Sequence, residues 1–182
     1  MAPLKFRKIA VLGYRSVGKS SLTIQFVEGQ FIDCYDPTIE NTFNKAVNFG
    51  GQDFHLQLVD TAGQDEYSMF SRSHTMDVHG YVLVYSVTSM KSFEVIKAIR
   101  GKLLDMVGKV QIPTVLVANK RDLTTERVVK TEEGKKLADS WGAAFLESSA
   151  KQNDTAVEIF KMIIQEIEKA DGYTQDKKCH MM

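Results

Sequence analysis

The chain has 182 residues, of which 43% are hydrophobic and 25% charged, so it fits one soluble globular domain with a substantial core. Its 23 basic and 23 acidic side chains cancel, which leaves no net positive charge to attract nucleic acid. The first residues lack the apolar segment of a signal peptide, and Ala2 stands where myristoylation needs glycine. We therefore expect a cytosolic protein in which the two cysteines form no disulfide.

Short apolar segments alternate with amphipathic ones along the chain. We expect strands at residues 7–12, 42–49, 54–60, 80–86, 114–119 and 144–147, and helices at residues 19–28, 66–75, 89–106, 131–140 and 155–170. This alternation predicts an α/β fold, a six-stranded, mainly parallel sheet with helices on both faces. Gly50-Gly51 leaves no room for a crossover helix, so the second strand should be an antiparallel edge strand. We assign residues 1–169 to one domain and residues 170–182 to a flexible tail.

A glycine-bounded loop, Gly13-Tyr14-Arg15-Ser16-Val17-Gly18-Lys19-Ser20, lies between the first strand and the first helix. Such a loop can wrap around a phosphate chain, with successive N–H groups and the positive end of the helix facing the anion. Lys19 can reach the β- and γ-phosphates, and the Ser20 hydroxyl can coordinate Mg²⁺. Alone, this motif predicts binding of a nucleoside triphosphate and leaves the base open. The candidate phosphate-binding residues are Arg15, Ser16, Val17, Gly18, Lys19, Ser20 and Ser21.

Polar motifs also follow the third, fifth and sixth strands, at the edge of the sheet where ligands bind in open α/β folds. In Asp60-Thr61-Ala62-Gly63-Gln64, Asp60 can hold a Mg²⁺-bound water and the Gly63 N–H can meet a γ-phosphate. Alone, an Asp-x-x-Gly sequence could be only a turn, but in this chain it accompanies the phosphate loop. Together they predict a nucleotide site with Mg²⁺.

The other two motifs predict that the base is guanine. In Asn119-Lys120-Arg121-Asp122, the Asp122 carboxylate can accept hydrogen bonds from guanine N1–H and its exocyclic amine, which adenine does not present. Asn119 would brace the loops, and the Lys120 stem could lie over the ring. In Ser148-Ser149-Ala150-Lys151, the Ala150 N–H can donate to guanine O6. These motifs also disfavour a small-molecule kinase built on a phosphate loop.

In this order and spacing, the motifs resemble the Ras family of small GTPases over about residues 5–169. The resemblance also rests on Tyr35-Asp36-Pro37-Thr38-Ile39-Glu40-Asn41-Thr42-Phe43, on Asp60-Thr61-Ala62-Gly63-Gln64-Asp65-Glu66-Tyr67 and on Gly101-Lys102-Leu103-Leu104-Asp105-Met106-Val107-Gly108-Lys109. It implies a P-loop NTPase fold and a monomeric GTPase that binds GTP or GDP with Mg²⁺. It also places Ser149 and Lys151 at the guanine.

The same resemblance implies two switch segments. Residues 35–40 would form the first, in which Thr38 coordinates Mg²⁺ and senses the γ-phosphate. Phe31 would stack on the guanine, and Ile32, Tyr35 and Asp36 would line the ribose and phosphates. Residues 60–67 would form the second switch, in which Gln64 orients the attacking water. The candidate catalytic residues are therefore Gln64, Thr38, Arg15 and Tyr35.

Arg15 departs from the Ras pattern, which has glycine at this position. A long side chain beside the γ-phosphate should crowd Gln64 and an incoming arginine finger, so we expect slow hydrolysis and a persistent GTP state. The main catalytic role of Gln64 is then open, because an activating protein can supply its own water-orienting group. An alternative function is a GTP-loaded module that hydrolyses negligibly and acts only by docking effectors through residues 36–43.

The chain ends in Cys179-His180-Met181-Met182, a prenylation box in which a final methionine favours farnesyl. His180 is unusual for this box. One lipid chain with Lys177 and Lys178 should give weak, reversible attachment to endomembranes after a prenyltransferase acts on Cys179. The sequence also resembles a growth-signalling branch of the family, and this resemblance implies a TOR kinase complex as effector and a tuberin-type activating protein.

Overall fold

The computed structural model describes residues 4–14, 22–23, 26–27, 41–60, 78–107, 112–119, 125, 127–148 and 153–180. At Asn41, Asp60, Val107, residues 153–155 and residues 171–180 it describes the backbone alone. Within these residues, no helix is both long enough and apolar enough to pass through a bilayer.

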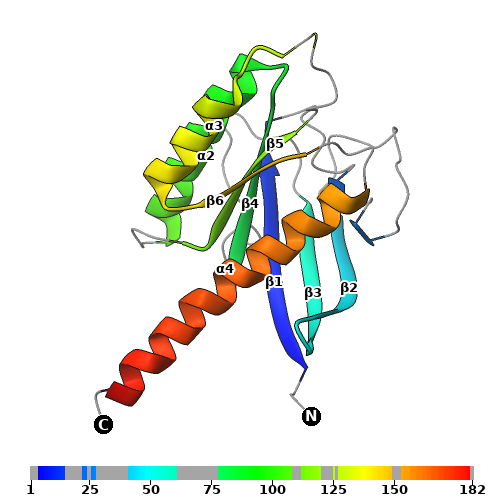
Figure 1. The fold of residues 1–182 in the computed structure, drawn as a ribbon, viewed down its shortest axis with the longest axis vertical. Helices are drawn as coiled ribbons and strands as arrows, with labels where there is room; N and C mark the ends of the chain where they lie inside the picture. Colours follow the sequence, from blue (N-terminus) through cyan, green and yellow to red (C-terminus); the bar gives the residue numbers. More distant parts are fainter. Residues whose placement is uncertain are drawn as a thin grey trace.

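The described strands form one sheet in the order β2-β3-β1-β4-β5-β6 (Figure 1). The strands are β1 (Lys5–Gly13), β2 (Asn41–Phe49), β3 (Gln52–Asp60), β4 (Gly80–Ser86), β5 (Thr114–Asn119) and β6 (Ala144–Glu147). All neighbours pair in parallel except β2, which lies at one edge and pairs antiparallel with β3. The predicted mainly parallel, six-stranded sheet with one antiparallel edge strand is confirmed.

The turn between β2 and β3 depends on two consecutive glycines. Gly50 and Gly51 have φ angles of 61° and 81°, in the left-handed region that side-chain-bearing residues rarely adopt. A two-residue turn of this hand matches the twist of the strands that it joins, so the pairing continues up to Phe49 and Gln52. This turn fixes the register of the edge strand against β3.

Three labelled helices cover the two faces of the sheet: α2 (Met90–Val107), α3 (Thr131–Trp141) and α4 (Asn153–His180). Alternate residues of β1 point to opposite faces, as a strand requires. Ile9 and Val11 belong to the buried cluster that includes α4, and Ala10 and Leu12 belong to the cluster that includes α2 and α3. Figure 1 shows α4 crossing one face of the sheet. The prediction of helices on both faces is confirmed.

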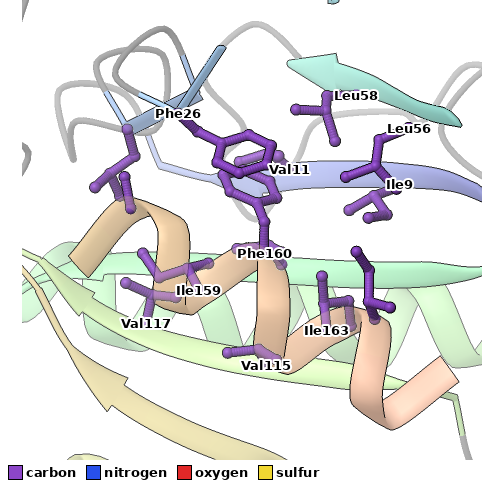
Figure 2. Close-up of a cluster of buried hydrophobic side chains, with 14 of the residues drawn as sticks. Ile9, Val11, Phe26, Leu56, Leu58, Val115, Val117, Ile159, Phe160 and Ile163 are labelled. Carbon is purple, nitrogen blue, oxygen red and sulfur yellow. The ribbon is translucent and has the colours of Figure 1, made fainter. Parts of the chain in front are cut away.

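The cluster on the α4 face contains a stacked aromatic pair (Figure 2). Phe160 of α4 is 1% exposed, and its ring lies 4.4 Å from the ring of Phe26 at an interplanar angle of 26°. Phe26 and Val27 have helical backbone, as do Leu22 and Thr23, inside the helix predicted at residues 19–28. The rest of that helix, and the helix predicted at residues 66–75, lie outside the described residues. The stack therefore joins α4 to the segment that follows the glycine-bounded loop.

Helix α4 extends further than its apolar pattern. The pattern predicts an end at Ala170, whereas the helical backbone continues to His180. Residues 171–180 contain no proline, so the backbone hydrogen bonds can continue, and Gly172 costs only about 1 kcal/mol within a helix. Apolar periodicity reports the part of a helix that packs on the core, and a helical end that leaves the core need not show it.

A three-residue ion cluster joins the start of β1 to α4. The Glu168 carboxylate accepts hydrogen bonds from Lys5 Nζ at 2.8 Å and from Arg7 Nε and Nη2 at 3.1 and 2.9 Å. Burial by itself would raise the pKa of Glu168, but the hydrogen bonds and positive charges of Lys5 and Arg7 outweigh it and lower this pKa. The ionised carboxylate is therefore the form that the fold favours.

We expect Glu168→Gln to lower the free energy of unfolding by about 0.5–1 kcal/mol near neutral pH, since it removes a partly exposed ion cluster. A carboxyl group whose pKa is lowered by folding stabilises the protein above its unfolded pKa, and this contribution disappears as the pH falls through the folded pKa. Urea unfolding at about pH 7 and about pH 4 should therefore show a smaller difference at acid pH. Glu166→Gln, which removes only an ion pair at 3.5 Å with exposed Lys169, is the control. An equal Glu168→Gln difference at both pH values would contradict this account.

Candidate functional site

The carboxyl ends of the parallel strands bring the predicted motifs to one edge of the sheet. Gly13 ends β1 in register with Val84, and Asn119 ends β5 in register with Ser86. Asp60 ends β3 in register with Val11 of β1. The ends of β3, β1 and β5 therefore lie at one edge of the sheet, with β3 next to β1 and with β4 between β1 and β5. The last motif leaves the same edge after β6.

Asn119 and Ser148 form a buried polar junction between two of these segments. Both residues are 0% exposed, and the Ser148 hydroxyl donates a hydrogen bond to Asn119 Oδ1 at 3.2 Å. The Ser148 N–H donates to the Ala118 carbonyl at 2.8 Å, and the Asn119 carbonyl accepts from the Val87 N–H at 3.0 Å. Because buried polar groups are costly unless paired, this junction holds the ends of β5 and β6 together. The geometry suits the bracing role predicted for Asn119.

An ion pair lies beside this junction. The Arg127 guanidinium donates from Nη1 and Nη2 to the two carboxylate oxygens of Glu147, at 2.8 and 3.1 Å. Thr131, the first residue of α3, donates from its hydroxyl to Glu147 Oε2 at 2.9 Å. The Glu147 hydrogen bonds, which outweigh the effect of burial, raise the pKa of Arg127. This two-bonded geometry is the strong form of an arginine–carboxylate pair.

Comparison with known proteins identifies the family. The Ras family model matches residues 8–169. The chain belongs to the Ras family. It is 69% identical to the GTP-binding protein Rheb of Mus musculus and 68% identical to that of Homo sapiens, in both cases over the whole of both chains. It is 63% identical to the GTP-binding protein Rheb homolog of Drosophila melanogaster, over 96% of each chain. The resemblance predicted from the motifs is confirmed.

Most residues that the Ras-family motifs assign to the site lie outside the described residues. Asn119 is described with its side chain, and Asp60 and Cys179 are described by their backbone. The site candidates outside the described residues are Arg15, Ser16, Val17, Gly18, Lys19, Ser20, Ser21, Phe31, Ile32, Tyr35, Asp36, Thr38, Gly63, Gln64, Lys120, Asp122, Ser149, Ala150 and Lys151.

Three residues near this Ras-family site were not predicted as site residues: Arg127, Thr131 and Glu147. Arg127 and Glu147 are 20 residues apart in the chain, and neither falls in a motif with fixed spacing. Their positions in the sequence, next to predicted motifs, could have indicated a role at the site. Glu147 immediately precedes the Ser148-Ser149-Ala150-Lys151 motif, and Arg127 follows soon after Asp122, so both flank segments that had been assigned to the base.

Proposed function

We propose that the chain is a small GTPase, a molecular switch that binds GTP and GDP with Mg²⁺ and hydrolyses GTP slowly. The observation that carries this proposal is the buried Asn119–Ser148 junction, which joins the two predicted guanine-recognition segments at the carboxyl edge of the sheet. Membership of the Ras family and the GTP-binding relatives support it. Ras-family GTPases are GTP hydrolases, and the slow rate is our inference from Arg15.

The nucleotide would lie along this edge, from the base at the end of β5 to the phosphates at the end of β1. Asp122 and the Ala150 N–H would bind the guanine edge, with Lys120 and Phe31 on the ring faces. Lys19 and the loop N–H groups would bind the phosphates. Each of these groups is a donor, acceptor or apolar surface that matches the part of the nucleotide assigned to it.

The predicted Mg²⁺ ligands fit that metal. Hydroxyl oxygens of Ser20 and Thr38, with Asp60 acting through water, are the hard oxygen donors that Mg²⁺ prefers. The register of Asp60 beside Val11 sets it at the level of the first strand's end, where the phosphate-binding loop begins. When bound, Mg²⁺ would neutralise phosphate charge, while these residues orient the two switch segments around it.

The switch action would depend on contacts to the γ-phosphate. Thr38 in the first switch and the Gly63 N–H in the second would both contact it, and its loss on hydrolysis would release both segments. Gln64 would orient the attacking water, unless an activating protein supplies its own group. Asp36 to Phe43 and the second switch form the proposed effector surface, for which a TOR kinase complex is the proposed partner. A tuberin-type protein is the proposed activator.

We expect Arg15→Gly to accelerate single-turnover GTP hydrolysis by about tenfold or more, because a displaced water-orienting group costs catalysis steeply. Arg15→Lys, which keeps a long cationic side chain at this position, is the matched control and should remain slow. GDP dissociation measured in parallel separates a change in chemistry from a change in binding. An Arg15→Gly rate equal to that of the unmodified chain would show that Arg15 does not crowd the reaction.

Arg15 also favours the second candidate function, a GTP-loaded effector-binding module with negligible hydrolysis. The two functions use the same pocket and differ only in turnover. Hydrolysis measured with and without a tuberin-type activating protein distinguishes them. A GTP state that persists in the presence of the activator supports the binding module.

The proposed prenyl group would lie far from the nucleotide. Glu168 of α4 binds Lys5 and Arg7 at the start of β1, and the chain beyond it continues away from the carboxyl edge of the sheet (Figure 1). Cys179 lies on this last part of α4. A membrane anchor there would leave the proposed switch segments accessible to proteins.

Cys179→Ser should lower the membrane-bound fraction of the protein in cells, because it removes the proposed site of prenylation. An unchanged membrane-bound fraction would refute the proposed lipidation.

A further inference from the structure

We propose that the Arg127–Glu147 ion pair is a clamp that holds the two guanine-recognition segments in position, so that both side chains contribute to base selectivity and nucleotide retention. The inference rests on the proposed function, because it assigns base recognition to Asp122 and Ala150. Arg127 and Glu147 would be positioning residues, since they act on these segments without contacting the nucleotide.

The geometry of the pair is that of a rigid connection. Two parallel N–H···O bonds fix the plane of the guanidinium against the plane of the carboxylate, which a single contact would leave free to rotate. Arg127 Nη1 also donates to the Val129 carbonyl at 3.2 Å, and Thr131 donates to Glu147. The side chains of Arg127 and Glu147 are only 21% and 18% exposed, so water competes weakly for these bonds.

The position of the pair in the chain connects it to both segments. The segment that contains Asp122 leaves β5 at Asn119 and is tied down again at Arg127. Glu147 lies in register with Ala118, next to Asn119, and is followed by Ser148. The Asp122 segment is therefore held at both ends by two consecutive residues. Ser148 binds Asn119 at its start, and Glu147, the last residue of β6, binds Arg127 at its end. Fixing both ends of a loop reduces the conformations available to it.

The packing beneath the pair keeps α3 close to the sheet. Tyr85 of β4 is 0% exposed, and its hydroxyl oxygen lies where a side chain at Gly134 of α3 would begin, beside the Phe145 ring. Among the described residues this hydroxyl has no hydrogen-bond partner, so it takes no part in the hydrogen bonds between Arg127 and Glu147. Loss of Arg127 would remove two hydrogen bonds from the Glu147 carboxylate in poorly hydrated surroundings, which costs more than the loss of an exposed contact.

Dissociation of GDP and of inosine diphosphate from the full chain tests the clamp. Inosine lacks the exocyclic amine that Asp122 would bind, so the ratio of the two rates reports how well Asp122 is positioned. We expect Arg127→Ala and Glu147→Gln to accelerate GDP dissociation by about tenfold and to bring the two rates closer together. Arg127→Lys should have an intermediate effect, because lysine keeps the charge and loses the two-bonded geometry.

Matched controls separate the clamp from a general loss of an ion pair. Lys97→Ala removes an exposed pair with Glu94, at 3.4 Å, on the surface of α2, and should change neither rate. Thermal melting of each nucleotide-bound variant reports stability. An unchanged rate of GDP dissociation in Arg127→Ala would overturn the clamp. It would also be overturned if GDP and inosine diphosphate dissociated faster by the same factor, in proportion to a lower Tm of the variant. The unmodified chain tests the proposed function separately, because a failure to retain GDP longer than inosine diphosphate would refute guanine recognition by Asp122.

Discussion

Replacing Asp122 with alanine is expected to lower the preference for GDP over ADP by about three to four orders of magnitude. The carboxylate would accept two hydrogen bonds from guanine, from N1–H and from the C2 amine, whereas adenine presents an unprotonated N1 and a C2–H. A site built around such bonds rejects the wrong base strongly, because its own polar group is then left unpaired. Competition between GDP and ADP for the nucleotide-free chain measures the preference directly.

Arg121→Ala is the matched control for this prediction. Arg121 lies next to Asp122 in the same motif and has no assigned contact to the base, so its replacement should leave the preference within about threefold of the unmodified value. If Asp122→Ala retained the full preference for GDP, base selectivity would have to come from the Ala150 N–H and from the shape of the pocket. That result would refute the role proposed for Asp122 while leaving nucleotide binding itself intact.

Three strands were predicted to the residue because their central residues are apolar and polar motifs follow them. Gly80–Ser86, Thr114–Asn119 and Ala144–Glu147 have the bounds that the sequence predicts. In contrast, β1 begins at Lys5, earlier than its apolar run. Its first residues pair with β3, with Lys5 opposite Phe54, and this pairing depends on a distant segment that apolar periodicity does not encode.

The polar contacts around the site were also harder to predict, because they too join segments that are distant in the sequence. Motifs with fixed spacing identified the segments that leave the carboxyl edge, because phosphate and base chemistry restricts the residue types there. The partners of Asn119 and Glu147 come from other elements, and a hydrogen bond between side chains leaves no periodic pattern in the sequence. Sequence reasoning therefore placed the site on the fold and missed the connections that hold its parts together.

Phe160→Ala is expected to lower the free energy of unfolding by about 3–5 kcal/mol, because it empties a fully buried aromatic position. Phe160 is 1% exposed and stacks on Phe26 at a ring distance of 4.4 Å (Figure 2). A large cavity there removes the stack and leaves the side chains around it without contacts. Chemical denaturation of the nucleotide-bound chain measures the loss. Phe6→Ala, at a residue that is 48% exposed, is the control and should cost less than about 1 kcal/mol.

Phe160→Ala should also accelerate GDP dissociation, because the stack of Phe160 on Phe26 supports the helical segment after the phosphate-binding loop. Besides Phe160, that segment is held by Lys45 of β2, whose Nζ donates to the Val27 carbonyl at 3.2 Å and lies 5.3 Å from the centre of the Phe26 ring. Without Phe160, Phe26 would lose its stacking partner and would keep the contact from Lys45 and the rest of the buried cluster. The helix start that should face the phosphates would then move more freely. A Phe160→Ala chain that lost stability and still released GDP at the unmodified rate would show that the loop is positioned independently of the α4 core.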